Sequence, residues 1–266
     1  MKNQRVPPKG CELCSFSQPA YRDLITLALA EGYCCVPFRD ALETAPKTMI
    51  LRHDIDFSIA AALTMAECEA DLGVRSTYFV MAANDYYNPF AKSNRKRLKQ
   101  IVSFGHEVGL HWDSSIYPAD QTKMALQFRH EVDALSDVVE TSIISASQHI
   151  PTDSPLFDVE GHITHEAYSE KWRARFSYVS DSSMSWRVKT PWDLIRKGVD
   201  IHFLSHPLWW FVEGECRNEK LRNAIISETN QSTAESERFI VYMNEILAKR
   251  EQVDANFRAQ KGWVST

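Results

Sequence analysis

Acidic residues and histidines recur in this chain where apolar segments end, and the first such pair is Asp54 and Asp56. Side chains alternate along a β-strand, so the two carboxylates share one face and lie about 7 Å apart. Such crowding is costly unless a cation or a proton lies between them, so one carboxylate could bind a metal ion while the other acts as a base. The alternative is that they cap the next helix, but Ser58 is already available as that cap.

Histidines end two later apolar segments. His111 lies near the end of the expected strand 106–113, and strand alternation places it on the same face as Asp113. His111 is therefore a candidate metal ligand. His206 ends the expected strand 199–206, where a general acid would be mounted.

Two more expected strands end in polar residues. His149 closes the strand 142–149, and Asp181, between two serines, closes the strand 176–181. The remaining candidate histidines are expected to be solvated side chains, and these are His130, His162 and His165. The run Trp209-Trp210-Phe211 is more typical of a hydrophobic lid or interface than of a recognition platform, although sugar rings also stack on tryptophan.

The elements that would carry these residues alternate between strand and helix. The pattern predicts strands at 48–56, 75–81, 106–113, 142–149, 176–181 and 199–206, and helices at 18–30, 58–72, 93–104, 122–139 and 236–252. Alternation with nearly continuous apolar strands predicts a single α/β domain built on a mostly parallel, barrel-like sheet, with its site at the carboxyl ends of the strands.

This core is expected to span 48–212. Residues 1–47 form a lead-in with one helix and one strand, and residues 213–266 form a C-terminal helical segment packed on the barrel. The pair Cys11 and Cys14 has zinc-ligand spacing, but no second such pair follows it, so a plain N-terminal segment is favoured over a metal or redox role.

Composition excludes several classes of protein. The chain has 266 residues, with 30 Lys plus Arg against 35 Asp plus Glu. It therefore lacks the excess of positive charge that binding to nucleic acid requires, and no nucleic-acid partner is expected. The longest apolar stretch, 24–38, is broken by Glu31, Gly32 and Pro37, so no membrane span is expected. The polar start lacks the apolar region of a secretion signal, which predicts a cytoplasmic protein. The oligomeric state stays open.

From Thr48 to about Trp210 the order of these motifs resembles the polysaccharide deacetylase family, also called the NodB-homology or carbohydrate esterase 4 group. The segment from Arg52 to Asp56 is similar to the RHDVD-type first motif of bacterial members that act in O-antigen and other surface-polysaccharide pathways. The resemblance implies a distorted (β/α) barrel and metal-dependent removal of an acetyl group from an N-acetylated sugar. A cytoplasmic location favours a small, nucleotide-linked or lipid-linked sugar as substrate.

The resemblance also implies roles for individual residues. Asp54 becomes the general base, His206 the general acid, and Asp56 and His111 ligands of a divalent metal ion for which zinc is expected. Asp181 matches the family's fourth motif and joins the catalytic set. Substrate contacts are expected from three tryptophans near the motifs, which are Trp112, Trp186 and Trp209.

Three features depart from the family pattern. Ser115 stands where the second motif normally supplies another histidine, Ile55 is inserted between the two aspartates, and the third motif around His149 has no arginine. Catalytic zinc usually has about three protein ligands. The third is expected to be His149, with Asp113 as the alternative. A catalytically silent carbohydrate-binding protein and a hydrolase of non-sugar amides are the rival interpretations.

Overall fold

The computed structural model describes residues 16–41, 47–151, 159 and 161–260. The chain divides into two compact units, Met1–Ala224 and Ile225–Thr266. The first unit contains every strand of the described residues, and the described residues of the second continue one helix. Cys11 and Cys14 lie outside the described residues, so the expectation about them stays a prediction.

The first unit is built on one eight-stranded sheet, and its strands pair in parallel among the described residues. Its strands are β1 (Cys34–Val36), β2 (Thr48–Ile55), β3 (Thr77–Val80), β4 (Glu107–Trp112), β5 (Ser145–Gln148), β6 (His165–Glu166), β7 (Ser177–Ser180) and β8 (Ile201–Ser205). The order is β6-β5-β4-β3-β2-β8-β7, and β1 pairs with the first half of β2. The predicted (β/α) barrel is therefore confirmed, in an open and distorted form.

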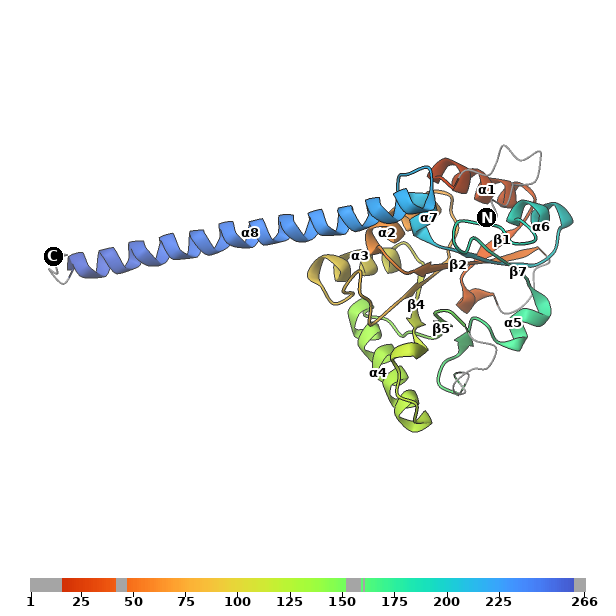
Figure 1. Cartoon of the computed structure of the whole chain (residues 1–266), viewed down its shortest axis with the longest axis horizontal. Coiled ribbons are helices and arrows are strands. Elements are labelled where there is room, and N and C mark those ends of the chain that lie inside the picture. Colours follow the sequence, from red (N-terminus) through yellow and green to blue (C-terminus); the bar gives the residue numbers. More distant parts are fainter. Residues whose placement is uncertain (1–15, 42–46, 152–158, 160, 261–266) are drawn as a thin grey trace, which may run out of the picture. The chain divides into compact units, whose positions relative to one another are not determined.

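Helices lie around this sheet (Figure 1). In the first unit they are α1 (Gln18–Ala30), α2 (Ile59–Asp71), α3 (Lys92–Ser103), α4 (Gln121–Val139), α5 (Glu170–Arg175), α6 (Pro191–Lys197) and α7 (Pro207–Phe211), with 3-10 turns η1 (Phe38–Asp40) and η2 (Ser114–Ile116). The last helix, α8 (Arg217–Gln260), begins in the first unit and continues through the second. Neighbouring helices contact one another in the sequence α4, α3, α2, α7, α1 and α6. Among the described residues, none of these helices is long and apolar enough to cross a membrane.

The two faces of β2 point into different surroundings. Met49, Leu51 and Ile55 belong to the large apolar core that also contains residues of α1 and α2. Ile50, two residues before Arg52 on the other face, belongs to a smaller apolar cluster inside the barrel. That cluster fills the barrel beneath the site, and its buried members are Phe38, Ala41, Ile50, Phe79, Ala167, Trp172 and Phe176.

A steric constraint explains why the residue in the middle of β4 is a glycine, Gly109. A Cβ atom built there would lie 2.5 Å from the ring of Phe79 and 2.8 Å from the carbonyl oxygen of Ser145. Only glycine lets this ring lie across β4 without displacing a strand. The glycine thereby keeps β3, β4 and β5 close together directly below His111.

The predicted strands of the core correspond to strands of the structure, but the sequence missed several short elements. β6 and the start of α5 lie in the segment 150–173, which has no regular apolar period, and α6 and α7 lie in connections where no helix was predicted. The expected C-terminal boundary at 213 also moves, because the first turns of α8 belong to the first unit, where Lys220 and Ala224 are buried. Packing of the second unit on the barrel stays a prediction. The lead-in helix and strand are part of the first unit, since β1 pairs with β2.

Candidate active site

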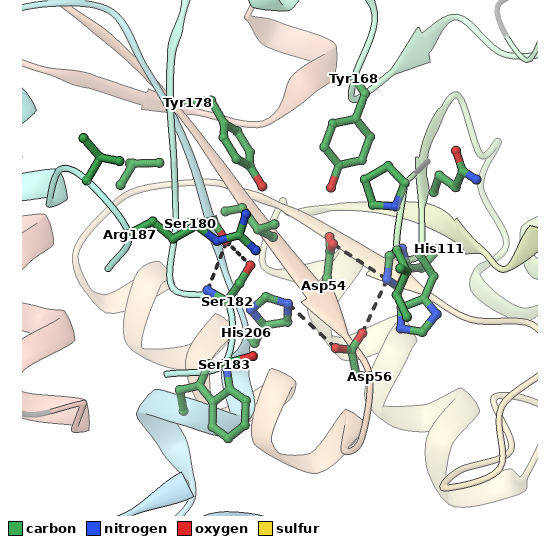
Figure 2. A pocket seen from close by; sticks show the side chains of 18 of the residues that line it. Asp54, Asp56, His111, Tyr168, Tyr178, Ser180, Ser182, Ser183, Arg187 and His206 are labelled. Carbon is green, nitrogen blue, oxygen red and sulfur yellow. Dashed lines mark hydrogen bonds and ion pairs between the residues drawn. The ribbon is translucent and has the colours of Figure 1, made fainter. Parts of the chain in front are cut away.

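A cavity of about 610 Å³ opens at the carboxyl ends of the strands, within the size range of small-molecule sites. The residues that line it come from five strands and from the connections that follow strands. They include Asp54 on β2 and Asp56 just after it, His111 on β4, Gln148 on β5 and His149 just after it, Tyr168 after β6, Tyr178 and Ser180 on β7, and Leu204 on β8 with His206 just after it. The strand ends that the sequence singled out therefore meet in one place. Figure 2 shows their side chains converging on the cavity.

Three of the predicted metal ligands lie together. Asp56, His111 and His149 each offer one ligand atom within 4.8 Å of the other two. The Nε2 atom of His111 lies 3.4 Å from Oδ1 of Asp56 and 3.7 Å from Oδ2 of Asp54. One carboxylate and two imidazoles form a donor set that suits zinc and other first-row divalent ions. The residues present thus fit a divalent cation.

The environment of the two histidines supports the same assignment. Nδ1 of His111 lies 2.9 Å from the carbonyl oxygen of Ser147, so that nitrogen donates, and the lone pair of Nε2 is left for a cation beside Asp56. His149 Nδ1 lies 3.3 Å from Oδ2 of Asp113. Asp113 is therefore placed to orient His149, and the structure favours His149 over Asp113 as the third ligand. Their role as ligands stays a prediction.

Asp54 is held by an arginine from its own strand. Nε and Nη2 of Arg52 donate to the two carboxylate oxygens of Asp54 at 2.9 and 2.8 Å, and both side chains are buried. The guanidinium also contacts Ser147 Oγ, donates to the Tyr168 hydroxyl at 2.9 Å and lies under the Tyr168 ring. Burial alone would raise the pKa of Asp54, but Arg52 and then His111 hold that pKa far below its usual range. The carboxylate is therefore ionised.

His206 is held by Asp181. Nδ1 of His206 lies 2.6 Å from Oδ1 of Asp181, and the His206 backbone amide and Trp210 Nε1 donate to the other oxygen at 3.0 and 2.7 Å. Nε2 of His206 then faces the cavity, 3.7 Å from Oδ2 of Asp56. Burial would lower the pKa of His206, but Asp181, then Asp56 and Asp54, raise it to about 9. The imidazole is therefore a protonated donor near neutral pH.

Some sequence expectations need correction. Asp181 is fully buried and does not line the cavity, so it is a positioning residue for His206 rather than a catalytic one. Trp112 is buried against Tyr117 and Phe128 on the face opposite His111, and it does not line the cavity. Strand alternation places Trp112 there, since it is the neighbour of His111.

Trp186 is also outside the cavity lining. It stacks on Phe16 with ring centroids 5.4 Å apart and lies edge-on to Trp192, so it belongs to the packed core. Trp209 alone of the three expected tryptophans lines the cavity, and with Trp210 it is buried rather than part of an exposed patch. His165, expected to be solvated, is buried because it forms β6.

Sequence reasoning missed two residues that the structure places beside the base. Arg52 supplies the guanidinium that the third motif lacks, and its spacing of two residues from Asp54 on one strand was a signal for it. Tyr168 lies in the irregular segment after β6, where no periodicity could place it. Ser115, which replaces the family histidine, donates its backbone amide to Oδ1 of Asp113.

Fold and site together define an open parallel (β/α) barrel with an Asp-His-His cluster, an anchored carboxylate and an anchored histidine in one cavity. Solved structures similar to this chain include the deacetylase PplD of Streptococcus pyogenes in complex with acetate (TM-score 0.39, 16% identity, 48% of this chain and 60% of that one). A family 4 acetyl xylan esterase from Clostridium thermocellum in complex with a cobalt ion is also similar (TM-score 0.44, 15% identity, 70% and 84%). So is the Xyl-CE4 domain of a multidomain xylanase from the hindgut metagenome of Trinervitermes trinervoides (TM-score 0.44, 14% identity, 69% and 83%).

The chain spans less than two thirds of the streptococcal deacetylase that it resembles. No family model matches the sequence, and no curated protein matches it.

Proposed function

We propose that this chain is a metal-dependent hydrolase that removes the N-acetyl group from an acetamido sugar. The observation that carries the proposal is the arrangement in one cavity of an Asp-His-His donor set flanked by Asp54 and His206. Each flanking residue has its own anchor, Arg52 for Asp54 and Asp181 for His206. Such fixed geometry is what hydrolysis of an unreactive amide requires.

A divalent cation held by Asp56, His111 and His149, with zinc as the expected ion, would supply Lewis acidity toward the acetamide carbonyl. The remaining chemistry belongs to the protein. Asp54 accepts the proton of the attacking water, since Arg52 keeps this carboxylate ionised. His206 donates a proton to the departing nitrogen, because an amide nitrogen leaves as an amine and not as an anion.

The lining of the cavity supports a sugar as the substrate class. Tyr168, Tyr178 and Trp209 bring aromatic rings to the cavity, and serine side chains near the end of β7 bring hydroxyl groups. Aromatic faces pack on the apolar face of a sugar ring, while hydroxyls exchange hydrogen bonds with those of the sugar. Figure 2 shows the hydroxyls of both tyrosines directed toward Asp54.

The biological setting is proposed from the motifs. The first motif from Arg52 to Asp56 resembles that of members acting in O-antigen and other surface-polysaccharide biosynthesis. We place the reaction in the cytoplasm, on a small, nucleotide-linked or lipid-linked acetamido sugar. This setting accounts for a cavity that is sized for a small molecule.

Acetate release tests the proposal. Metal-loaded protein is incubated with a panel of acetamido sugars, beside chelator-treated protein and the Asp54→Asn variant. We expect acetate from at least one sugar, lost with the chelator and lost in the variant although the variant still binds metal. Sugar binding that survives the chelator, with no acetate from any sugar, would instead favour the silent carbohydrate-binding interpretation. Acetate from a non-sugar amide alone would favour the other amide hydrolase.

A further inference from the structure

The segment between β7 and α6 brings two cationic side chains to the cavity. Arg187 and Lys189 line the same cavity as Asp54 and Asp56. Figure 2 shows the Arg187 side chain reaching into the cavity beside Ser182. Neither cation takes part in the proposed hydrolysis, which leaves their presence in the cavity to be explained.

No carboxylate of the described residues forms an ion pair with either cation. The nearest acids in the sequence already have partners. Asp181 accepts from His206 and Trp210, and Asp193 accepts from the amide and hydroxyl of Thr190. The acids that line the cavity are also committed, since Arg52 pairs with Asp54 and Asp56 belongs to the histidine cluster. Among the residues that the structure describes, Arg187 and Lys189 therefore give this side of the cavity positive charge that no carboxylate balances.

The short segment that carries the two cations, residues 186–190, is fixed at both ends. Trp186, directly before Arg187, is packed among the rings of Phe16 and Trp192. Thr190, directly after Lys189, forms a capping box with Asp193 at the start of α6. Fixed ends reduce the entropy lost when side chains between them bind a ligand.

The turn before this segment is held in an unusual conformation. Ser183 and Met184 have φ values of 58° and 56°, a region that non-glycine residues rarely adopt. The Met184 amide donates to the Asp181 carbonyl at 2.8 Å, which closes the turn, and Ser183 lines the cavity. Strained turns of this kind cluster at ligand sites.

From these observations we infer that the substrate carries an anionic group, a phosphate or a carboxylate, which Arg187 and Lys189 bind while the acetamide lies at the histidine cluster. The inference rests on the proposed function and names its substrate class. Guanidinium groups bind the paired oxygens of either anion, and lysine adds a point charge. An uncharged acetamido sugar would leave both cations without a partner.

Three acetamido sugars test the inference. UDP-N-acetylglucosamine carries phosphate, the methyl glycoside of N-acetylglucosaminuronic acid carries a carboxylate, and methyl N-acetylglucosaminide is neutral. The readout is the ratio of kcat/KM for acetate release between each charged sugar and the neutral one, for the wild type and for the double variant Arg187→Gln/Lys189→Gln. Lys197→Gln is the matched control, because Lys197 is exposed on α6 and does not line the cavity.

We expect the wild type to prefer one charged sugar, and the double variant to lower that ratio by about tenfold. The control keeps the wild-type ratio, and the preferred sugar tells phosphate from carboxylate. A wild type that hydrolyses the neutral sugar as well as both charged ones, or a ratio that the double variant leaves unchanged, overturns the inference.

A binding measurement separates this inference from the proposed function. If no sugar releases acetate, calorimetric binding of the two charged sugars is compared between the wild type and the double variant. Binding that the double variant loses supports the anion site although the hydrolase assignment has failed. Binding that is absent in the wild type, or equal in the two proteins, overturns the anion site.

Discussion

On each face of β2 an acidic residue and a histidine lie side by side, and the two faces differ in what these residues can do. On the cavity face, Asp54 and Asp56 lie beside His111, and the cavity gives them access to a ligand. On the helix face, His53 lies between Ser205 and Glu69, with 2.8 Å from each of its ring nitrogens to an oxygen.

By residue type alone, Ser205, His53 and Glu69 have the composition of a nucleophilic triad. The structure excludes that role, since all three are fully buried and the cavity lining includes none of them. Glu69 also accepts hydrogen bonds from the hydroxyls of Tyr21 and Tyr78 at 2.6 and 2.7 Å. The comparison teaches that access and unused ligand atoms, rather than residue type, separate a site from a structural network. The cavity face should therefore control activity, and the helix face stability.

Replacing the histidine of the cavity face should have the largest effect. In His206→Ala the proton donor to the leaving nitrogen is lost, and kcat should fall by roughly 10²–10⁴-fold. KM should change little, whereas the melting temperature should fall, because the buried carboxylate of Asp181 loses the imidazole that faces it. Steady-state acetate release and thermal unfolding measure both quantities. Turnover equal to that of the wild type would contradict the assignment of His206.

Replacing the acid of the helix face should affect stability instead. Glu69→Ala leaves His53 without its carboxylate and removes the acceptor of two buried tyrosine hydroxyls, which should cost roughly 3–5 kcal/mol of unfolding free energy. The control is Glu67→Ala, two residues away on the exposed side of α2, which should stay within about 0.5 kcal/mol. Urea unfolding gives both values. A variant as stable as the control would mean that the network does not stabilise the fold.

The same network should make stability depend on pH. Burial would raise the pKa of Glu69, but His53 and then the other donors lower it to about 2 from an ordinary 4.5. A lowered pKa means that the contribution is complete above pH 4.5 and is lost as the pH falls toward 2. The stability difference between the wild type and Glu69→Gln should shrink by about 3 kcal/mol over that interval. A difference that stays constant in urea unfolding at several pH values would show that Glu69 does not titrate there.

A smaller effect should follow from changing Arg52, which anchors Asp54. Arg52→Lys keeps the charge but cannot donate to both oxygens of Asp54 in parallel, so kcat should fall by roughly 10–100-fold. Arg95→Lys, on α3 and outside the lining of the cavity, is the matched control and should keep full activity. KM should change less than kcat if the role is to position Asp54. Unchanged kcat in Arg52→Lys would show that one hydrogen bond is enough.

The sequence predicted much of this arrangement because two simple rules apply to it. Apolar runs located the strands β2 to β5, β7 and β8, and the gathering of carboxyl ends brought Asp56, His111 and His149 together. The same rules failed for Glu69, since an acidic residue in an alanine-rich helix is typical of a solvated position. The local apolar pattern does not show that the hydroxyls of Tyr21 and Tyr78, from other elements, donate hydrogen bonds to Glu69.

The errors about tryptophan have a related cause. Trp112 and Trp186 were chosen because they stand beside motif residues, but neighbours along a strand point to opposite faces. Trp186 instead fixes a loop by packing in the core, which no local pattern shows. The sequence predicted substrate contacts for these two tryptophans, whereas tertiary packing places both of them against other aromatic rings.

The central claim is that the cavity face of β2 contributes to a metal site, and metal content tests it most directly. Protein without a histidine tag is incubated with zinc, cobalt or nickel, dialysed, and measured by elemental analysis for the wild type, Asp56→Ala and Glu69→Gln. The account predicts close to one ion per chain in the wild type and in Glu69→Gln, and loss of that ion in Asp56→Ala. A wild type that retains no metal, or an Asp56→Ala variant that retains all of it, would contradict the account.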